Sequence, residues 1–415
     1  MVINYFCLFF LSFSLLAKDK PEIISLKQIS PKLNSAHSSS LNNNSVLEII
    51  GELLKNKYLD LPSPLMDMDN IDSCLKVRAL SASLKGVHSG QLFSISYNQA
   101  CLVGGEIIWR PLYILKETTK GPAEIKNLFR VKQSILGEKR ISTKQLLQES
   151  YSSKNNSEAL ISFDDMHFSI TNKSQTRYFS LLQTAKGRSL HSILVEFGNH
   201  IEMLDTTQIE NSPAYRNMQH MFYRIGFATS KLHQKFSQHS LEDHGIMGKT
   251  LIHGDFHAQN IFYATENGDV TLIDNETYAM SLKHKSSGIN DVIDLYLLHS
   301  TKTFAHYFAK QIFTNADFGI NDQIWHQLWQ QLVIGYIEAY DHLSAQQQMS
   351  LLDEIAREFK KGLSNRWLLH PYTKIKDQRK LKRLGPSKRR IHLRKNMKKF
   401  FASVSELMVQ EQQHY

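Results

Sequence analysis

One segment of the chain concentrates chemically active side chains between short apolar runs, and it limits the fold more than any other. Residues 251–279 read "LIHGDFHAQNIFYATENGDVTLIDNETYA" and include His253, Asp255, His257, Asn260 and Asp274. Residues of these types commonly form turns. Their density here also fits a site that binds a metal ion and moves a proton, provided that the apolar runs are strands and the polar residues occupy the loops at their ends.

The neighbouring sequence predicts a β-rich part followed by a helical part. Five apolar or alternating runs predict strands: "KVRALSASL", "GQLFSISYN", "EIIWRPLYILKE", "DMHFSIT" and "RYFSLLQTA". One helix, "GPAEIKNLFRVKQSIL", follows the third run. Later segments such as "PAYRNMQHMFYRIGFATSKLHQKF" carry apolar residues at helical spacing. We therefore expect an α+β fold with two lobes, a small antiparallel β-rich lobe and a mainly helical lobe, with a cleft between them.

These patterns divide the chain of 415 residues, which is long enough for two or three domains, into five parts. An early run, "SVLEIIGELLKNKYL", has the apolar spacing of a single helix. The expected parts are a signal or anchor segment (1–17), a Ser- and Asn-rich approach with this helix (18–74), the N-terminal lobe (75–182), the C-terminal lobe (183–370) and a basic tail (371–415).

The first residues suggest export. The apolar run from Tyr5 to Ala17 has the length of a signal peptide and is short for a membrane span. No Lys or Arg precedes it, and Leu15-Leu16-Ala17 departs from the small-x-small cleavage pattern. We expect an exported or secreted protein. An uncleaved anchor or a misplaced start would instead leave the protein cytoplasmic or membrane-associated.

The positive charge of the chain is concentrated in the tail. The whole chain carries +10, whereas residues 374–399 hold thirteen Lys or Arg against one Asp, so that this window carries +12 and the remainder −2. A solvated, partly helical extension would explain the window. The sharper alternative is contact with an anionic membrane surface. Nucleic acid is the least favoured partner, because the window has no aromatic residues between its basic ones.

The cysteines do not define a framework. Cys7, Cys74 and Cys101 are too few and too scattered for a disulfide framework or a zinc site. Removal of a leader would leave Cys74 and Cys101. One bridge between them could then form, although no sequence pattern indicates it.

The polar segment resembles a known catalytic loop. Protein kinases carry H-R-D-x-x-x-x-N, in which the Asp addresses the acceptor hydroxyl and the Asn holds Mg²⁺. "HGDFHAQN" has the same step from Asp to Asn, with Gly254 in place of Arg, and "LIDNE" follows it. HGDxHxxN followed by I-D-x-E is similar to the aminoglycoside phosphotransferase and choline kinase group, small-molecule kinases with a protein-kinase-like fold. The similarity covers about residues 77–370.

This resemblance implies ATP and Mg²⁺ as cofactors and a role for each residue of the segment. Asp255 would accept or orient the proton of the acceptor hydroxyl. Asn260 and Asp274 would bind Mg²⁺, which prefers oxygen ligands. Four supporting residues are also implied: His253 bracing the loop, His257 bracing it or reacting, Glu276 assisting the metal or facing the acceptor, and Asp294 bonding the catalytic loop from a helix start.

The resemblance also implies nucleotide-binding residues in the N-terminal lobe. Lys116, at the end of the third predicted strand, would hold the ATP phosphates, with Glu124 of the following helix behind it. Glu117 is the alternative partner, and a solvated surface Lys116 is the plainer interpretation. Further contacts would come from a nucleotide-covering turn with Ser89 and Gly90, and from a hinge at Gln183 and Ala185 whose backbone would meet adenine.

The expected activity is transfer of the ATP γ-phosphate to a hydroxyl of a small molecule, such as an aminoglycoside, an amino alcohol or a sugar-like acceptor. Gly254 replaces the Arg with which protein kinases bind activation-loop phosphate, and no A-P-E motif follows Asp274. Both departures favour a small acceptor over a protein. Residues 201–300 hold twelve acids against seven Lys or Arg, which favours a cationic or neutral acceptor.

Two questions stay open from the sequence alone. Trp325, Trp329 and Tyr336 could line the acceptor pocket or form a helix core. The protein could also be a non-catalytic or regulatory kinase-like module, recruited to a membrane or a host partner through its basic tail.

Overall fold

The computed structural model is an α+β protein that divides into two compact units. One unit consists of Met1–Ser152 and Phe163–Thr184, and the other of Ser153–Ser162 and Ala185–Tyr415. The structure describes residues 23–25, 41–56, 58–59, 71–80, 89–118, 121–126, 128–129, 159–161, 164–172, 175–235, 250, 252–254, 256–274, 288–289, 291–292, 318–369 and 401–409. The expected leader (1–17) and basic window (374–399) lie outside these ranges.

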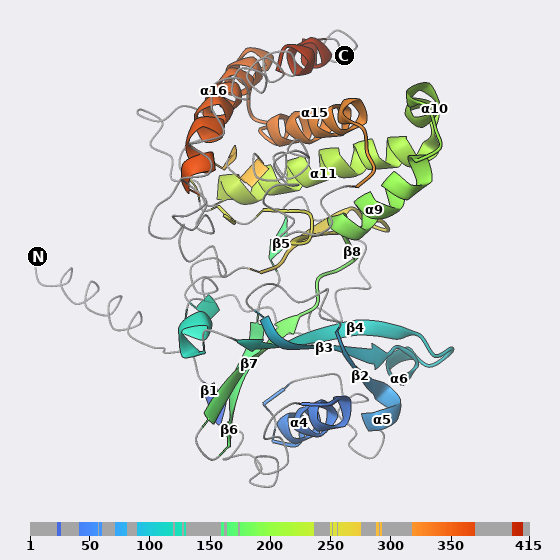
Figure 1. The fold of residues 1–415 in the computed structure, drawn as a ribbon, viewed down its shortest axis with the longest axis vertical. Coiled ribbons are helices and arrows are strands. Elements are labelled where there is room, and N and C mark those ends of the chain that lie inside the picture. Colours follow the sequence, from blue (N-terminus) through green and yellow to red (C-terminus); the bar gives the residue numbers. More distant parts are fainter. Residues whose placement is uncertain are drawn as a thin grey trace, which may run out of the picture. The chain divides into compact units, whose positions relative to one another are not determined.

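A six-stranded sheet forms the centre of the first unit, with the strand order β1-β6-β7-β4-β3-β2 (Figure 1). Its strands are β1 (Ile23–Ser25), β2 (Leu75–Ala79), β3 (Ser89–Asn98), β4 (Trp109–Thr118), β6 (Asp164–Asn172) and β7 (Gln175–Gln183). All neighbours pair antiparallel except β1, which runs parallel to β6. The five strands predicted from the sequence are present, and β1 is an additional edge strand.

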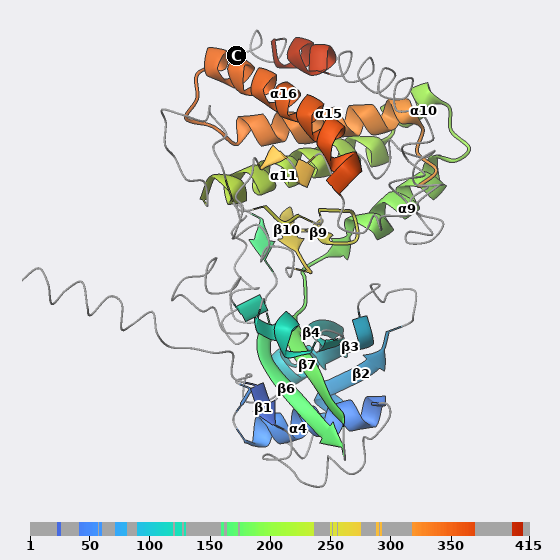
Figure 2. The same ribbon diagram turned by 60° about the vertical axis from the view of Figure 1, so that its left-hand side comes forward.

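Helix α4 (Asn43–Lys55) packs against this sheet, as both views show (Figures 1 and 2). Asn42 caps the helix, because its side chain accepts a hydrogen bond from the Ser45 N–H at 2.8 Å. On β4, Tyr113 and Leu115 are buried in the core shared with α4. Side chains alternate along a strand, so Ile114 and Lys116 belong to the opposite face of the sheet. Lys116 is therefore directed away from the α4 core.

A disulfide bond joins Cys74 to Cys101, whose Cα atoms are 5.9 Å apart. Cys74 ends the short helix α5 (Ile71–Cys74), and Cys101 lies in α6 (Ala100–Val103), between β3 and β4. The bond thus ties the beginning of β2 to the β3–β4 connection. The sequence left this bridge open, because two cysteines 27 residues apart form no diagnostic spacing.

Helices dominate the second unit: α9 (Leu190–Ile201), α10 (Thr206–Asn211), α11 (Pro213–Lys235), α15 (Asp322–Glu338) and α16 (Ala345–Leu369). Helices α11 and α15 lie side by side in both views (Figures 1 and 2). Between them, the rings of Phe222 and Trp325 meet edge to face, with centroids 5.7 Å apart. Trp325, Trp329 and Tyr336 are all almost fully buried. These aromatic residues therefore form the helix core and do not line an acceptor pocket.

A four-stranded sheet completes this unit, in the order β5-β10-β9-β8. Its strands are β5 (Leu160–Ile161), β8 (Arg188–Ser189), β9 (Ile261–Ala264) and β10 (Asp269–Leu272). Strands β9 and β10 form an antiparallel hairpin, and β5 pairs parallel with β10. The polar residues 253–260 thus precede the first hairpin strand, and Asp274 follows the second.

One further sequence expectation concerns a helix of the first unit. Of the helix predicted over residues 121–136, the structure describes 122–126 and 128–129 as helical. Within the described ranges, no helix combines the length and the apolar character that crossing a bilayer requires.

Candidate functional site

The candidate functional feature of the first unit is a buried ion pair on the six-stranded sheet. Lys116 lies on β4, and its Nζ is 3.2 Å from Oε1 of Glu124. Glu124 belongs to the helical turn of residues 122–126, directly after Gly121. The Lys116 side chain is 11% exposed and that of Glu124 is fully shielded. Because a charged group is costly to bury unless it is paired, the pair holds an ammonium group at a fixed place on the sheet.

Glu117, the alternative partner of Lys116, binds other residues. Its Oε1 accepts a hydrogen bond from Arg177 Nε at 2.6 Å, and its Oε2 accepts one from the Gln91 N–H at 2.9 Å. A Cβ atom on Gly90 would lie 2.5 Å from that Oε2. Glycine at this position therefore makes room for the Glu117 carboxylate, which links β3, β4 and β7.

In the second unit, two hydrogen bonds join the polar loop to the residue before Asp274. The Ile273 N–H donates to the carbonyl of Asn260 at 3.0 Å. The carbonyl of Ile273 accepts a hydrogen bond from His253 Nε2 at 2.8 Å. These bonds hold both ends of the loop, His253 and Asn260, against the same residue. Asn260 and Asp274 are consequently presented from neighbouring strand ends of the β9–β10 hairpin.

The buried carboxylate of Asp291 holds the beginning of the loop from another side. Its Oδ2 accepts a hydrogen bond from the His253 N–H at 2.7 Å, and its Oδ1 accepts one from the Gly254 N–H at 2.8 Å. Nε2 of His233, on α11, lies 3.2 Å from Oδ2. Burial raises the pKa of Asp291, but the hydrogen bonds that it accepts from His233 and from the Gly254 N–H outweigh burial and leave the pKa below its ordinary value. A charged Asp291 thus fixes the loop backbone.

His233 is held in turn by a tyrosine of α15. Its Nδ1 lies 3.0 Å from the hydroxyl oxygen of Tyr336. Burial raises the pKa of Tyr336 well above its ordinary value. The hydroxyl therefore stays protonated and donates a hydrogen bond to Nδ1. The Nε2–H of His233 then faces Asp291. A Cβ atom on Gly288 would lie 2.5 Å from Nδ1 and 2.6 Å from the hydroxyl oxygen, so this glycine leaves the space that the pair occupies.

Asp274 has a left-handed backbone conformation, which is uncommon for residues that have a side chain. Its φ is 59°, and among the described residues it alone combines a positive φ with a side chain. Such strain costs on the order of 1 kcal/mol and gathers at functional sites. The residue is exposed, whereas Asn260 is buried with its amide nitrogen 3.1 Å from His257 Nε2. His257 therefore braces Asn260, and Asp274 lies at the surface.

Three expected residues lie outside the described part of the chain: Asp255, Glu276 and Asp294. Their roles stay predictions. The expected bond from Asp294 to the catalytic loop is thus untested. The structure shows bonds to the start of this loop from Asp291, three residues earlier in the same run. Asp291 and its partner His233 were not among the expected site residues. Two sequence features could have pointed to them. Asp291 lies in the same run as Asp294, and His233 lies at the end of the predicted helix before the loop.

The expected nucleotide-turn and hinge residues are placed as follows. Ser89 and Gly90 are the first residues of β3, not part of a turn, and residues 81–88 lie outside the described ranges. Gln183 ends β7, and the division between the two units falls directly before Ala185.

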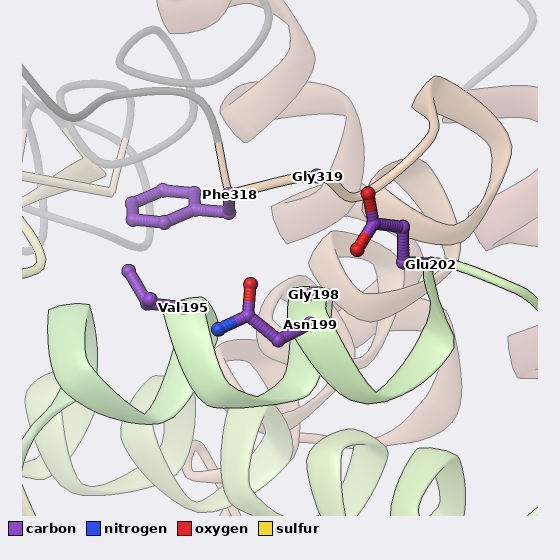
Figure 3. Close-up of a pocket in the computed structure, with 6 residues that line it drawn as sticks. All are labelled: Val195, Gly198, Asn199, Glu202, Phe318 and Gly319. Atoms are coloured by element: carbon purple, nitrogen blue, oxygen red, sulfur yellow. The ribbon is translucent and has the colours of Figure 1, made fainter.

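The second unit also has a cavity of about 300 Å³ between α9 and the segment before α15 (Figure 3). It is lined by Val195, Gly198, Asn199, Glu202, Phe318 and Gly319. The backbone approaches closely here, since a Cβ atom on Gly198 would lie 1.5 Å from the Phe318 carbonyl oxygen. None of the expected site residues lines this cavity.

The donor set of the loop fits Mg²⁺. Over the described residues, no three His, Cys, Asp or Glu side chains are grouped to hold a metal ion. Mg²⁺ does not need such a group, because it keeps several waters and binds through one or two carboxylates together with substrate phosphates. The exposed carboxylate of Asp274 and the side-chain oxygen of Asn260, on two bonded strand ends, meet that requirement.

Comparisons with known proteins add little to this geometry. No family model matches the chain, and no curated protein matches it in sequence. Among solved structures, the chain is similar to one from Ralstonia eutropha that is provisionally described as an aminoglycoside phosphotransferase. The identity is 11%, the TM-score is 0.23, and the match covers 85% of this chain and 99% of the other. A likeness at this TM-score carries no argument about function.

Proposed function

We propose that the chain is an ATP- and Mg²⁺-dependent phosphotransferase with a two-lobed, kinase-like fold, which moves the γ-phosphate of ATP to a hydroxyl group of a small molecule. One observation supports this most: the loop of residues 253–260 is bonded at both ends to Ile273 and at its beginning to Asp291. Phosphoryl transfer depends mainly on positioning and on charge neutralisation. A loop held this firmly suits that task.

Each residue would have a distinct task. Asp255, directly after the bonded Gly254, would accept the proton of the acceptor hydroxyl. Asn260 and Asp274 would hold Mg²⁺, which neutralises phosphate charge when bound. Lys116, paired with Glu124, would contact the ATP phosphates.

A small acceptor is favoured over a protein. Gly254 has a φ of 78°, a conformation that an Arg side chain would strain, and its N–H is bonded to Asp291. This position thus suits glycine, and the loop does not have the Arg that binds activation-loop phosphate in protein kinases. An amino alcohol, an aminoglycoside or a sugar-like compound is the expected acceptor class.

The test combines binding with turnover. ATP and Mg²⁺ together should raise the melting temperature of the native protein, and a panel of hydroxylated acceptors should include one that gains phosphate. Asp274→Asn should lose both responses, whereas Glu266→Gln, which changes an exposed acid on the β9–β10 turn, should keep them. Binding without transfer to any acceptor would favour the non-catalytic module, and no response to ATP and Mg²⁺ would contradict the proposal.

A further inference from the structure

An exposed apolar tip closes the β3–β4 hairpin of the first unit. It consists of Val103, Ile107, Ile108 and Trp109, which are 59%, 71%, 40% and 36% exposed. Four of the seven exposed large apolar side chains of the described residues therefore gather on one connection. Isolated exposed apolar side chains are common on proteins, but a contiguous group indicates a contact surface. We call these four residues the hairpin tip.

The hairpin tip is held in place by the surrounding structure. The Gln99 N–H donates to the carbonyl of Ile108 at 2.8 Å. Gly104 and Gly105, with φ of 72° and 92°, form the turn. The disulfide of Cys101 anchors α6 beside it. Because the tip is already ordered, its apolar side chains can be buried in a partner without a large loss of conformational entropy.

Positive charge flanks the hairpin tip. Nζ of Lys76 lies 5.5 Å from the centre of the Trp109 ring. Arg110 is exposed, and its Nε donates a hydrogen bond to Gln99 Oε1 at 2.9 Å. From residue 99 to residue 110 the sequence contains one acid, Glu106. The tip thus combines an apolar end with a net positive rim.

We propose that the hairpin tip is a membrane-contact site for an anionic lipid surface. Ile107, Ile108 and Trp109 would enter the boundary between headgroups and acyl chains, where Trp side chains are favoured. Lys76 and Arg110 would meet the negative headgroups, which attract basic residues near the surface. The hairpin extends outward beside α6 (Figure 1). A stable protein interface buries roughly 800 Å² per partner, and a narrow tip supplies little of that area. A lipid surface is therefore the better partner.

This site is distinct from the basic window of residues 374–399 and does not depend on the proposed catalytic function. The experiment uses the full chain, with the tail intact in every variant, and phosphatidylcholine vesicles with and without phosphatidylserine. Binding is measured by flotation, and insertion by quenching of Trp fluorescence with brominated acyl chains. Trp367 is replaced by Phe in every protein compared, so that the buried Trp325 and Trp329 give a constant background.

The native protein should bind the vesicles that contain phosphatidylserine. Ile107→Ser together with Ile108→Ser should lower the affinity about tenfold or more, since two apolar side chains no longer leave water. Met203→Ser is the matched control, because Met203 is 92% exposed but lies in the second unit. It should bind as the native protein does. Trp109→Phe should abolish the quenching by brominated lipid, and Lys76→Gln with Arg110→Gln should reduce the preference for phosphatidylserine.

Four outcomes would overturn the proposal. The first is that the native protein binds neither kind of vesicle. The second is that the double Ser variant binds as tightly as the native protein. That result would place the contact elsewhere, for example in the tail. The third is that the native protein binds the vesicles but the brominated acyl chains do not quench the fluorescence of Trp109. The fourth is that the double Ser variant loses self-association while vesicle binding is unchanged, which would make the tip a contact between two copies of the chain. Equal melting temperatures of all variants will show that the fold is intact, as expected for exposed positions.

Discussion

Nζ of Lys116 and Oε1 of Glu124 lie 3.2 Å apart on the six-stranded sheet, and water hardly reaches either group. A buried ion pair contributes little net stability, because the loss of hydration offsets the attraction between the charges. Removal of one partner is much more costly, because the other charge then remains buried alone. The pair is therefore better explained by the chemistry of its ammonium group than by stability, and this view can be tested.

Glu124→Leu should lower the free energy of unfolding by about 3–5 kcal/mol, since it leaves the Lys116 ammonium without its partner. The double variant Lys116→Met with Glu124→Leu should recover most of that loss in urea unfolding. Both variants should nevertheless lose thermal stabilisation by ATP and Mg²⁺. Lys126→Met, at an exposed position of the same helical turn, is the control and should change neither quantity. Retained ATP binding in the double variant would show that Lys116 has no part in it.

Asp274 allows backbone strain and ligand binding to be separated. Asp274→Gly should be as stable as the native protein or more stable by about 1 kcal/mol, because glycine adopts a φ of 59° without strain. Asp274→Ala should be less stable than the Gly variant by a similar amount. Neither variant should respond to ATP and Mg²⁺, because both lack the carboxylate. Melting temperatures with and without nucleotide measure both effects, and a Gly variant that still responds to Mg²⁺ would exclude Asp274 as a ligand.

Asp291 should make the free energy of unfolding fall at acidic pH. Its pKa in the folded protein lies below the ordinary value of 3.8, so its contribution is fully present above that value and is lost as the pH falls through the lower, folded-state pKa. Asp291→Asn should cost about 3 kcal/mol or more at neutral pH, since a buried charged acceptor of three hydrogen bonds is removed. It should also flatten the fall of stability with acid. Asp341→Asn, at an exposed position paired with Lys231, is the control and should have a small effect. A native protein and an Asp291→Asn variant with equal acid sensitivity would contradict the assignment.

Tyr336 should hold the His233 ring through its hydroxyl. In Tyr336→Phe, Nδ1 of His233 loses its donor, and the free energy of unfolding should fall by about 1–2 kcal/mol. Nitrogen NMR of His233 should show the Nε2–H tautomer in both proteins, because the Asp291 carboxylate still accepts a hydrogen bond from Nε2. Tyr340→Phe, whose ring centre lies 6.4 Å from that of Tyr336, is the matched control and should cost less. An unchanged free energy of unfolding in Tyr336→Phe, or an Nδ1–H tautomer in the native protein, would contradict this arrangement.

The disulfide should stabilise the first unit. Reduction of Cys74–Cys101 should lower its free energy of unfolding by about 3 kcal/mol, the amount expected for a closed loop of this length. Cys101→Ser should show the same loss and no further response to a reductant. Denaturant unfolding with and without reductant makes the comparison. Because such bonds persist mainly in oxidising compartments, a free-thiol assay of the protein taken directly from cells should detect neither cysteine if the protein is exported.

Strong periodicity allowed much of the fold to be predicted. The apolar spacing of residues 213–236 indicated a helix that the structure has at Pro213–Lys235, and the run that ends near Lys116 indicated β4. The pairing of Lys116 with Glu124 was implied by the resemblance to kinases, applied to a predicted strand end and the next predicted helix. By contrast, β1 and β5 have three and two residues, too few for an alternation to be visible. Their pairing depends on contacts with distant strands.

The supports of the loop could not be predicted for a related reason. Asp291 bonds to His253 across 38 residues of sequence, and His233 reaches Asp291 across 58. No local pattern records such a contact, because it arises only when separate helices pack together. The Asp–Asn spacing of the loop is local and was recognisable. The role of Asp255 stays a prediction, since this residue lies outside the described part of the chain.

The placement of β5 has a practical consequence for anyone who cuts this protein into pieces. The chain passes from the first unit to the second at residue 153, returns at 163 and leaves again at 185. A fragment that begins at Ala185 would lack β5 and would present an unpaired edge of β10, which invites aggregation. A chain nicked by a protease just before Ala185, however, should stay together under native conditions, because the upstream piece contributes a strand to the downstream sheet.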